Sequence, residues 1–379
     1  YIKFDYSIFE VFYIIIKIDM KLPKAKIINV EKYVAGLSTF RKKSAKIKLS
    51  ANESALGPSP NAIKEYIKIS KNFKKYPDSD GVLLRNTLAK KFKLNPKQII
   101  LGSGSDQILE LICKAFLNKN DEVIVSKYSF IVYRIYSKIN AAKVIYAKEN
   151  NFVVSIKNIL SSVSKKTKIV FIANPNNPTG TCVNKKDLVA LRKKLRSDIL
   201  LVVDDAYFEY VNEKDYKSGL DLFSKSKNVI ITRTFSKIYG LAGLRVGWGY
   251  ASKQIIDSLN LIKPPFNVNK PALFAASASV KDTRWLKKEI VHNNKWREIM
   301  FKNFSRMKIE TNQGNANFLL VNFERFKISS KKVFSLLAKA GILVREMKVY
   351  GITNYLRITI GKANENKKII SKLGKILNV

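Results

Sequence analysis

The chain has 379 residues, of which 46% are hydrophobic, so it can form one large α/β domain and a smaller domain around a sizeable core. Lysine and arginine outnumber aspartate and glutamate by 70 to 29, which gives a formal net charge of +41. The basic residues are spread along the whole chain and no tract alternates them with aromatic residues, so we expect no nucleic-acid partner.

Cysteine usage and the N-terminal segment limit where the protein acts. Cys113 and Cys182 lie far apart, without a metal-ligand or CxxC spacing. This predicts neither a disulfide framework nor a metal site, and it favours the reducing cytoplasm. The apolar run at 8–16 contains Glu10 and is too short to span a bilayer. We therefore expect residues 1–19 to form an arm outside the folded domains, and we expect no membrane partner.

Short apolar runs alternate with helix-length segments from about residue 98 onwards. Most runs are rich in valine and isoleucine and apolar on both faces, as in parallel strands that have helices on either side. They lie at 98–101, 122–126, 143–147, 168–173, 199–204, 229–233 and 245–251. The alternation predicts an α/β fold with a mainly parallel seven-stranded sheet. The connection before the last run is short and rich in glycine, so we expect that strand to run antiparallel.

The two chain ends differ from this central region. Residues 20–75 and 275–379 mix helices with a few strands, near 318–321 and 355–360. We predict that these ends together form a smaller α+β domain, and that residues 76–274 form the large ligand-binding domain.

Polar motifs follow several apolar runs directly, at the carboxyl ends of the expected strands, where open α/β sheets bind ligands. The first is GSGSD at 102–106, before a predicted helix. Its small residues and the helix N-terminus suit a phosphate group. A GxG turn before a helix is also a common plain turn. Gln107 stands where a dinucleotide fingerprint needs glycine or alanine.

Two further motifs end in asparagine and acidic residues. NPNNPTG at 174–180 predicts a rigid loop whose amides can donate hydrogen bonds, although a rigid surface turn explains it equally well. DDAY at 204–207 follows an apolar strand. A carboxylate at Asp204 would be partly buried and would need a cationic partner, such as a protonated pyridinium nitrogen. Tyr207 can reach the same pocket and donate to a phenolate oxygen.

The fourth motif is TRTFSK at 232–237, followed by LAGLR at 241–245. Lys237 lies among small and apolar residues, so it can lose its proton more readily than a surface lysine, which suits Schiff-base chemistry. Arg245 offers an always-charged phosphate partner. Each motif alone has a plain structural explanation. In this order on successive strands they describe a pyridoxal 5'-phosphate site.

With LSANESALGPSP at 49–60 and LRITIG at 356–361, these motifs make the chain resemble the fold-type-I (class II) aminotransferases, and within them the histidinol-phosphate aminotransferases. The resemblance runs from about residue 33 to residue 361. It implies transamination of L-histidinol phosphate with 2-oxoglutarate, which gives imidazole-acetol phosphate and glutamate in histidine biosynthesis.

Three alternatives stay open. Aromatic-amino-acid aminotransferases and threonine-phosphate decarboxylases share the cofactor residues of this family, so the motifs around Lys237 do not separate them. A basic nucleic-acid-binding protein on an inactive scaffold would be expected to lack a cofactor residue, and none is missing from this sequence.

The resemblance also assigns cofactor roles. Lys237 would carry pyridoxal phosphate as a Schiff base and move the proton, Asp204 would keep the ring nitrogen protonated, and Asn177 and Tyr207 would bind the phenolate oxygen. The remaining cofactor set comprises Ser105, Asp106, Thr234, Ser236 and Arg245 at the phosphate, Tyr128 stacked on the ring, and Tyr76, which would reach the phosphate of the neighbouring subunit in a homodimer.

The same resemblance implies substrate residues. Arg357 would bind the α-carboxylate of glutamate or the phosphate of histidinol phosphate, and Arg345 would be an additional phosphate ligand. Asn52 begins the segment Asn52-Glu53-Ser54-Ala55, where the family usually reads NENP. This segment borders the substrate pocket. The DDAY motif stands in place of DEAY. Together, the two arginines favour a phosphorylated substrate.

Overall fold

The computed structural model describes residues 30–379 except 41–42 and 313. The expected arm at 1–19 therefore lies outside the described residues. The chain divides by its contacts into Tyr1–Lys32 and Tyr33–Val379, and the described helices and strands lie in the second unit. No helix of this described part is long and apolar enough to cross a membrane.

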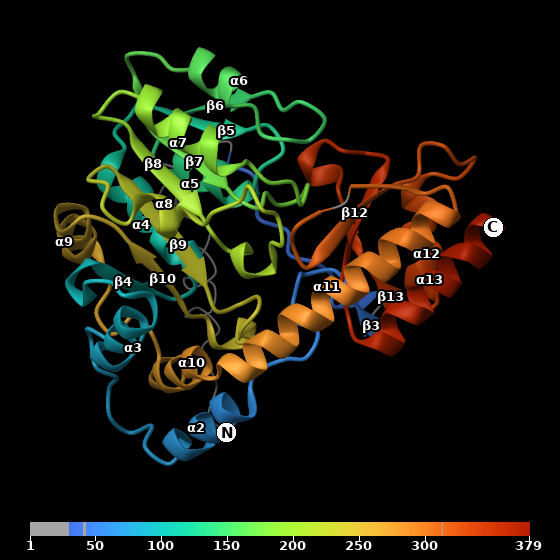
Figure 1. The fold of residues 1–379 in the computed structure, drawn as a ribbon, viewed down its shortest axis with the longest axis horizontal. Helices are drawn as coiled ribbons and strands as arrows, with labels where there is room; N and C mark the ends of the chain where they lie inside the picture. The colour runs from blue at the N-terminus through green and yellow to red at the C-terminus, as the bar shows by residue number, and fades with distance from the viewer. Residues whose placement is uncertain (1–29, 41–42, 313) are drawn as a thin grey trace, which may run out of the picture. The chain divides into compact units, whose positions relative to one another are not determined.

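A seven-stranded sheet forms the centre of the larger half of this unit (Figure 1). Its strand order is β4-β10-β9-β8-β7-β5-β6. The strands are β4 (Ile99–Gly102), β5 (Glu122–Ser126), β6 (Lys143–Ala147), β7 (Thr167–Ala173), β8 (Leu200–Asp204), β9 (Val229–Thr234) and β10 (Gly247–Tyr250). Neighbouring strands from β5 to β9 pair in parallel, whereas β10 is antiparallel to both β9 and β4. The predicted mainly parallel sheet with an antiparallel last strand is therefore confirmed.

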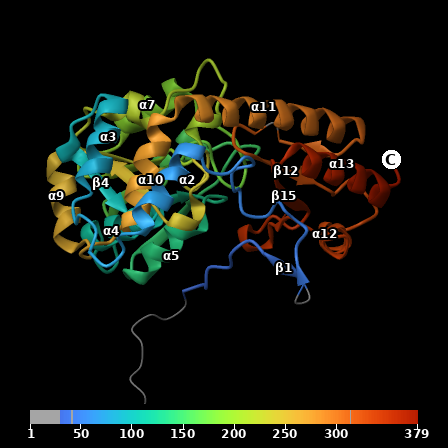
Figure 2. The ribbon, with the colours of Figure 1, turned by 90° about the horizontal axis from the view of Figure 1, so that it is seen from below.

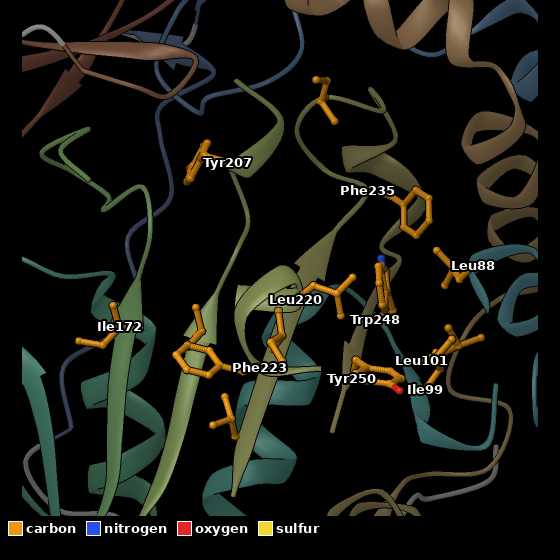
Figure 3. Packing of buried hydrophobic residues seen from close by; sticks show 14 of the residues in the cluster. Leu88, Ile99, Leu101, Ile172, Tyr207, Leu220, Phe223, Phe235, Trp248 and Tyr250 are labelled. Carbon is orange, nitrogen blue, oxygen red and sulfur yellow. The ribbon is translucent and has the colours of Figure 1, made fainter. Parts of the chain in front are cut away.

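Helices pack around this sheet because its central strands are buried on both faces. They are α2 (Pro60–Ser70), α3 (Val82–Phe92), α4 (Ser105–Phe116), α5 (Ile131–Ile139), α6 (Ile156–Ser161), α7 (Lys185–Lys194), α8 (Gly219–Phe223), α9 (Lys253–Ile262) and α10 (Lys270–Lys281). Trp248, Phe235 and Leu88 gather in the core between β10 and α3 (Figure 3). Tyr207 lies beyond the end of β8.

A second, four-stranded antiparallel sheet has the order β11-β12-β15-β14. Its strands are β11 (Glu310–Thr311), β12 (Phe318–Asn322), β14 (Arg345–Glu346) and β15 (Tyr355–Thr359), and α12 (Ser330–Lys339) and α13 (Ala363–Leu377) pack nearby. An early strand, β3 (Ile47–Lys48), pairs in parallel with β13 (Ile342–Leu343), so both chain ends contribute to this second core. The remaining short elements are β1 (Thr39–Phe40), β2 (Lys43–Ser44), η1 (Pro96–Gln98), η2 (Phe208–Tyr210), η3 (Ala242–Leu244) and η4 (Lys348–Tyr350).

The long helix α11 (Thr283–Arg306) extends from α10, beside the large sheet, to α13, beside the small sheet (Figures 1 and 2). It begins where Asp282 Oδ1 accepts the backbone N–H of Trp285 over 3.1 Å. Ala62 of α2 and Ala276 of α10 fall within the predicted small domain (20–75 and 275–379), yet both belong to the core of the large sheet. The division into domains at residues 75 and 275 stays a prediction.

Candidate active site

A cavity of about 330 Å³ lies at the carboxyl ends of β7, β8 and β9, where Ala173, Asp204 and Thr234 line it. Twelve of the fourteen residues expected at the site line this cavity: Asn52, Ser105, Asp106, Asn177, Asp204, Tyr207, Thr234, Ser236, Lys237, Arg245, Arg345 and Arg357. Tyr128 and Tyr76 do not belong to its lining. The two chain ends and the central sheet thus meet around one space.

An anion cradle forms where β4 turns into α4. Gly104 precedes α4 with φ 78°, and it gives the helix no side-chain cap. Arg245 lies against this turn, and it donates hydrogen bonds to Ser236 Oγ over 3.1 Å and to Asp106 Oδ2 over 3.2 Å. A Cβ at Gly104 would lie 2.2 Å from Arg245 Nη2, so a larger residue here would strain the backbone at φ 78° and make the guanidinium move. A helix N-terminus beside an arginine suits a phosphate group.

Asp204 is a buried acid held by a tyrosine. It is 5% exposed, and Tyr133 Oη donates to its Oδ2 over 2.6 Å. The backbone N–H of Ala206 donates to Oδ1 over 3.2 Å. Burial raises the pKa of Asp204 to about 6, although these hydrogen bonds favour the ionised form. A cationic ring nitrogen in the cavity would compensate for this buried charge.

Lys237 follows β9 and projects its amine into the cavity. Its Nζ lies 5.6 Å from the centre of the Tyr207 ring and donates to Ala51 O over 3.4 Å. Burial, together with the charge of Arg357, lowers the pKa of Lys237 to about 8. A substantial fraction of the amine is therefore unprotonated at mildly alkaline pH, as a nucleophilic lysine requires.

The tyrosine and the asparagine loop are held by residues that are distant in sequence. Asn52 Nδ2 donates to Tyr207 Oη over 3.0 Å, and the backbone N–H of Asn52 donates to Thr359 Oγ1 over 3.0 Å. Arg357 donates to Asn177 Oδ1 and, over 3.2 Å, to the carbonyl oxygen of Ser50. These contacts join the loop after β7 to β15 and to the segment after β3.

Arg345 lines the cavity and also binds the N-terminal segment. Its two terminal nitrogens donate to the carbonyl oxygens of Val34 and Ala35. Tyr33, Ala35 and Gly36 of this segment line the cavity too. Arg345 is thus at the predicted place, but here its hydrogen bonds hold the chain segment that passes over the cavity.

The aromatic residue of the 127–130 segment that faces the cavity is Phe130, not Tyr128. The Tyr128 ring packs against Phe152 with centroids 5.5 Å apart. Phe130 directly precedes α5, and its ring meets that of Tyr133 edge-on at 5.7 Å. The placement of Tyr128 on the cofactor ring therefore needs correction. The turn into α5 directs Phe130 and Tyr133 inward and leaves Tyr128 outside.

Tyr76 lies on the surface, with 78% of the residue exposed. Its ring stacks on Phe266 with centroids 4.5 Å apart and planes 15° apart. It takes no part in the cavity of its own chain. This placement leaves Tyr76 available to a second subunit.

Sequence reasoning missed several cavity residues. Tyr133, Phe130 and Tyr350 line the space, as does Glu53, which pairs with Lys48 over 2.8 Å. The i, i+3 spacing of Phe130 and Tyr133 at the start of a helix could have predicted that both face the cavity, because residues at this spacing share one helix face. No signal marked Tyr350. Within the described residues, no group of three or more potential metal-binding side chains occurs.

The residues that line the cavity fit the chemistry of pyridoxal phosphate, because an anion cradle, a buried acid and an amine of lowered pKa face one space.

The family described as aminotransferase class I and II matches residues 44–373. The chain is 49% identical over 360 residues to a histidinol-phosphate aminotransferase of Pelagibacter ubique (strain HTCC1062), covering 95% of this chain and 100% of that protein. A histidinol-phosphate aminotransferase of Rhodopseudomonas palustris (strain BisB18) is 37% identical, covering 94% and 98%.

Solved structures share the fold. The crystal structure of histidinol-phosphate aminotransferase from Sinorhizobium meliloti, in complex with pyridoxal-5'-phosphate, matches with a TM-score of 0.83 at 22% identity, covering 89% of this chain and 92% of that chain. An aspartate aminotransferase of Thermus thermophilus with maleate matches at a TM-score of 0.79 and 18% identity, over 88% and 92%. The fold is that of the fold-type-I aminotransferases, and with the family match over most of its length the chain belongs to the class I and II aminotransferases.

Proposed function

We propose that this chain transfers the amino group of L-histidinol phosphate to 2-oxoglutarate, with pyridoxal 5'-phosphate as its cofactor. The observation that carries the proposal is one cavity in which a half-buried lysine, Lys237, lies with two arginines, Arg345 and Arg357. The relatives that share 49% and 37% identity over nearly the full length are named histidinol-phosphate aminotransferases, which supports this amino substrate. The products would be imidazole-acetol phosphate and glutamate, within histidine biosynthesis.

The cofactor phosphate would be held by the cradle at the start of α4. Ser105, Thr234, Ser236 and Arg245 line this part of the cavity, and Asp106 orients the Arg245 guanidinium through its 3.2 Å contact. The bound cofactor supplies an electron sink that stabilises negative charge on the substrate α-carbon.

The proton chemistry would fall to three side chains. Lys237, with a pKa lowered to about 8, accepts and returns a proton at Nζ near the substrate α-carbon. Asp204, whose carboxylate is buried, would hold the ring nitrogen of the cofactor and keep a proton there. Burial raises the pKa of Tyr207 to about 12, so this phenol keeps its proton and can donate it, together with the Asn177 amide, to a ring oxygen.

The two arginines would select the substrates. Arg357, fixed by Ser50 and Asn177, presents a guanidinium to a carboxylate or phosphate. Arg345 adds a second positive charge in the same cavity, and a phosphorylated amine suits two guanidinium groups better than a neutral aromatic ring does. This favours histidinol phosphate over tyrosine or phenylalanine. Asn52 would border the substrate, because it lines the cavity and its hydrogen bond to Tyr207 fixes its side chain there.

The test is an amino-transfer assay on the purified, cofactor-loaded protein. We expect glutamate to form from 2-oxoglutarate with histidinol phosphate, and far more slowly with tyrosine or phenylalanine. Lys237→Ala should abolish the activity and the visible cofactor absorbance. Preference for tyrosine, or release of CO₂ from threonine phosphate, would overturn the substrate assignment while leaving the cofactor assignment intact.

We further propose a homodimer in which Tyr76 reaches the cofactor phosphate of the neighbouring subunit. Other large apolar side chains, on α2, near Tyr76 in sequence and at the Phe266 ring that stacks on it, are exposed as well: Ile63, Tyr66, Ile67, Phe73, Val82 and Phe266. A second copy of the chain would remove this surface from water. Light scattering should give twice the chain mass. A monomer that is fully active at all concentrations would contradict the shared site.

We also propose that the protein acts in the cytoplasm. Cys113 and Cys182 are free thiols, and burial raises the pKa of each to about 12, so neither readily forms the thiolate that disulfide exchange needs. A fold without a structural disulfide between them suits a reducing compartment. Cell fractionation should recover the activity in the cytosolic fraction, and recovery elsewhere would contradict this location.

A further inference from the structure

A buried carboxylate of α11 supports the loop that continues the cavity wall. Glu289 is 1% exposed. Ser54 Oγ donates to its Oε1 over 2.9 Å, and the backbone N–H of Ala55 donates to the same oxygen over 3.2 Å. The backbone N–H of Leu56 donates to Oε2 over 3.3 Å. Three consecutive residues of one loop thus converge on one side chain.

This loop lies between α11 and the turn that carries the lysine. Trp285 Nε1, one helical turn before Glu289, donates to the carbonyl oxygen of Gly57 over 3.2 Å. On the other side, a Cβ at Gly240 would lie 2.2 Å from the carbonyl carbon of Gly57, so the two backbones are in close contact. The N–H of Gly240 donates to Lys237 O over 3.0 Å. The loop thus packs between Trp285 of α11 and Gly240 of the turn that follows Lys237.

The loop begins at residues that face the cavity. Asn52 and Glu53 line it, and Asn317 Nδ2 donates to both of their carbonyl oxygens, over 3.0 and 3.2 Å. Asn52 has φ 54°, which favours asparagine over most other residues and needs support from its surroundings. Asn317 holds this segment from one end, and Glu289 holds its continuation from the other.

We infer that Glu289 is a positioning residue, which fixes the wall formed by Asn52 and Glu53 so that it fits the amino substrate. Glu289 does not line the cavity, so it acts only through the loop. A carboxylate suits this place because it accepts hydrogen bonds with both oxygens and has no proton to clash with the loop N–H groups. Its loss would leave the partly buried donors of Ser54, Ala55 and Leu56 without their acceptor. The substrate part of this inference rests on the proposed function.

The test compares variants of the full-length, cofactor-loaded protein. Glu289→Ala should speed hydrogen–deuterium exchange at Ala55 and Leu56, while exchange in the large sheet stays unchanged. We expect the KM for histidinol phosphate to rise about tenfold, with kcat within about twofold of the wild-type value. Glu289→Gln keeps one acceptor oxygen, so its exchange rate and its KM should lie between those of the wild type and those of Glu289→Ala. Glu298→Ala on the same helix is the control, because that carboxylate is exposed and pairs with Lys302.

The inference is wrong if Glu289→Ala keeps wild-type exchange at residues 54–56, or if kcat falls while KM is unchanged. If Glu289→Ala does not fold, Glu289→Gln and Ser54→Ala carry the same comparison, since each removes part of the acceptor–donor set. Faster exchange in Glu289→Ala combined with a wild-type protein inactive on histidinol phosphate would overturn the proposed function but support the loop contact.

Discussion

The phenol of Tyr133 donates to the buried carboxylate of Asp204 over 2.6 Å, and the Tyr133 ring stacks on Phe171 of β7 with centroids 4.8 Å apart. A residue at the start of α5 thereby sets the orientation of the acid at the end of β8. Because both groups are buried, this hydrogen bond is made in a medium that strengthens it.

Tyr133→Phe should weaken cofactor binding. The hydrogen bond lowers the pKa of Asp204, so its loss raises that pKa above about 6 and disfavours the carboxylate that the ring nitrogen needs. A hydrogen bond to a charged group contributes about 2 kcal/mol, so we expect the Kd for pyridoxal phosphate to rise at least tenfold. Titration of the apo-protein measures it, with Tyr136→Phe as the control on the same helix. An unchanged Kd would show that Tyr133 is dispensable.

Arg357→Gln should shift the pH dependence of cofactor attachment. Arg357 lowers the pKa of Lys237, because its positive charge disfavours the protonated amine. Without that charge the amine holds its proton to higher pH. In the wild-type apo-protein the attachment rate should rise through a midpoint near pH 8, and in the variant through a more alkaline midpoint. Arg357→Lys keeps the charge and should keep the midpoint. Identical midpoints in Arg357→Gln and wild type would contradict the electrostatic coupling.

Gly104→Ala should displace Arg245 from the anion cradle. The added Cβ would lie 2.2 Å from Arg245 Nη2, at a backbone φ of 78° that side chains rarely adopt. We expect cofactor affinity to fall at least tenfold, because the displaced guanidinium loses its charge-assisted hydrogen bonds to the phosphate, which contribute about 2 kcal/mol each. Gly243→Ala is the matched control, because a Cβ there meets nothing within 4 Å. Equal affinities of the two variants would argue against the cradle.

Phe130→Ala and Tyr128→Ala should differ in their effect on the bound cofactor. Phe130 lines the cavity, whereas Tyr128 packs against Phe152 outside it. Loss of the Phe130 ring should weaken pyridoxal phosphate binding by about tenfold, which corresponds to about 1.4 kcal/mol of aromatic contact. Tyr128→Ala should leave the Kd within about twofold. The reverse order would restore the assignment based on resemblance.

Asp205→Asn should destabilise the fold without touching the cavity. Arg233 Nη2 lies 3.4 Å from Asp205 Oδ2, and both side chains are almost fully buried. Its guanidinium carbon also lies 3.5 Å from the centre of the Phe208 ring. Removing the carboxylate leaves a buried charge without its counter-ion, which costs about 3 kcal/mol in the free energy of unfolding.

Urea denaturation checks this prediction. Asp257→Asn serves as the control, since its pair with Lys253 is exposed and should contribute at most about 1 kcal/mol. If Asp205→Asn is no less stable than Asp257→Asn, the prediction fails, and the aromatic rings packed against Arg233 are enough to stabilise its buried charge without Asp205.

The sequence by itself determined the large sheet, and it predicted most of the polar residues that line the cavity. Strands such as 122–126 and 143–147 begin and end where the apolar runs do, because a run of apolar β-branched residues is a local property. The anion cradle at Gly104 and the turn that carries Lys237 after β9 could also be predicted from the sequence. Both depend on residues adjacent in sequence, and strand carboxyl ends gather at one edge of a parallel sheet.

Only the tertiary structure decided which distant side chains meet. Asn52 reaches Tyr207, and Arg357 reaches Asn177, across more than 150 positions of chain. The inward turn of Phe130, rather than Tyr128, depends on where α5 packs. Such contacts arise from the packing of whole elements and from side-chain directions set by that packing. Neither the spacing nor the composition of the sequence specifies them.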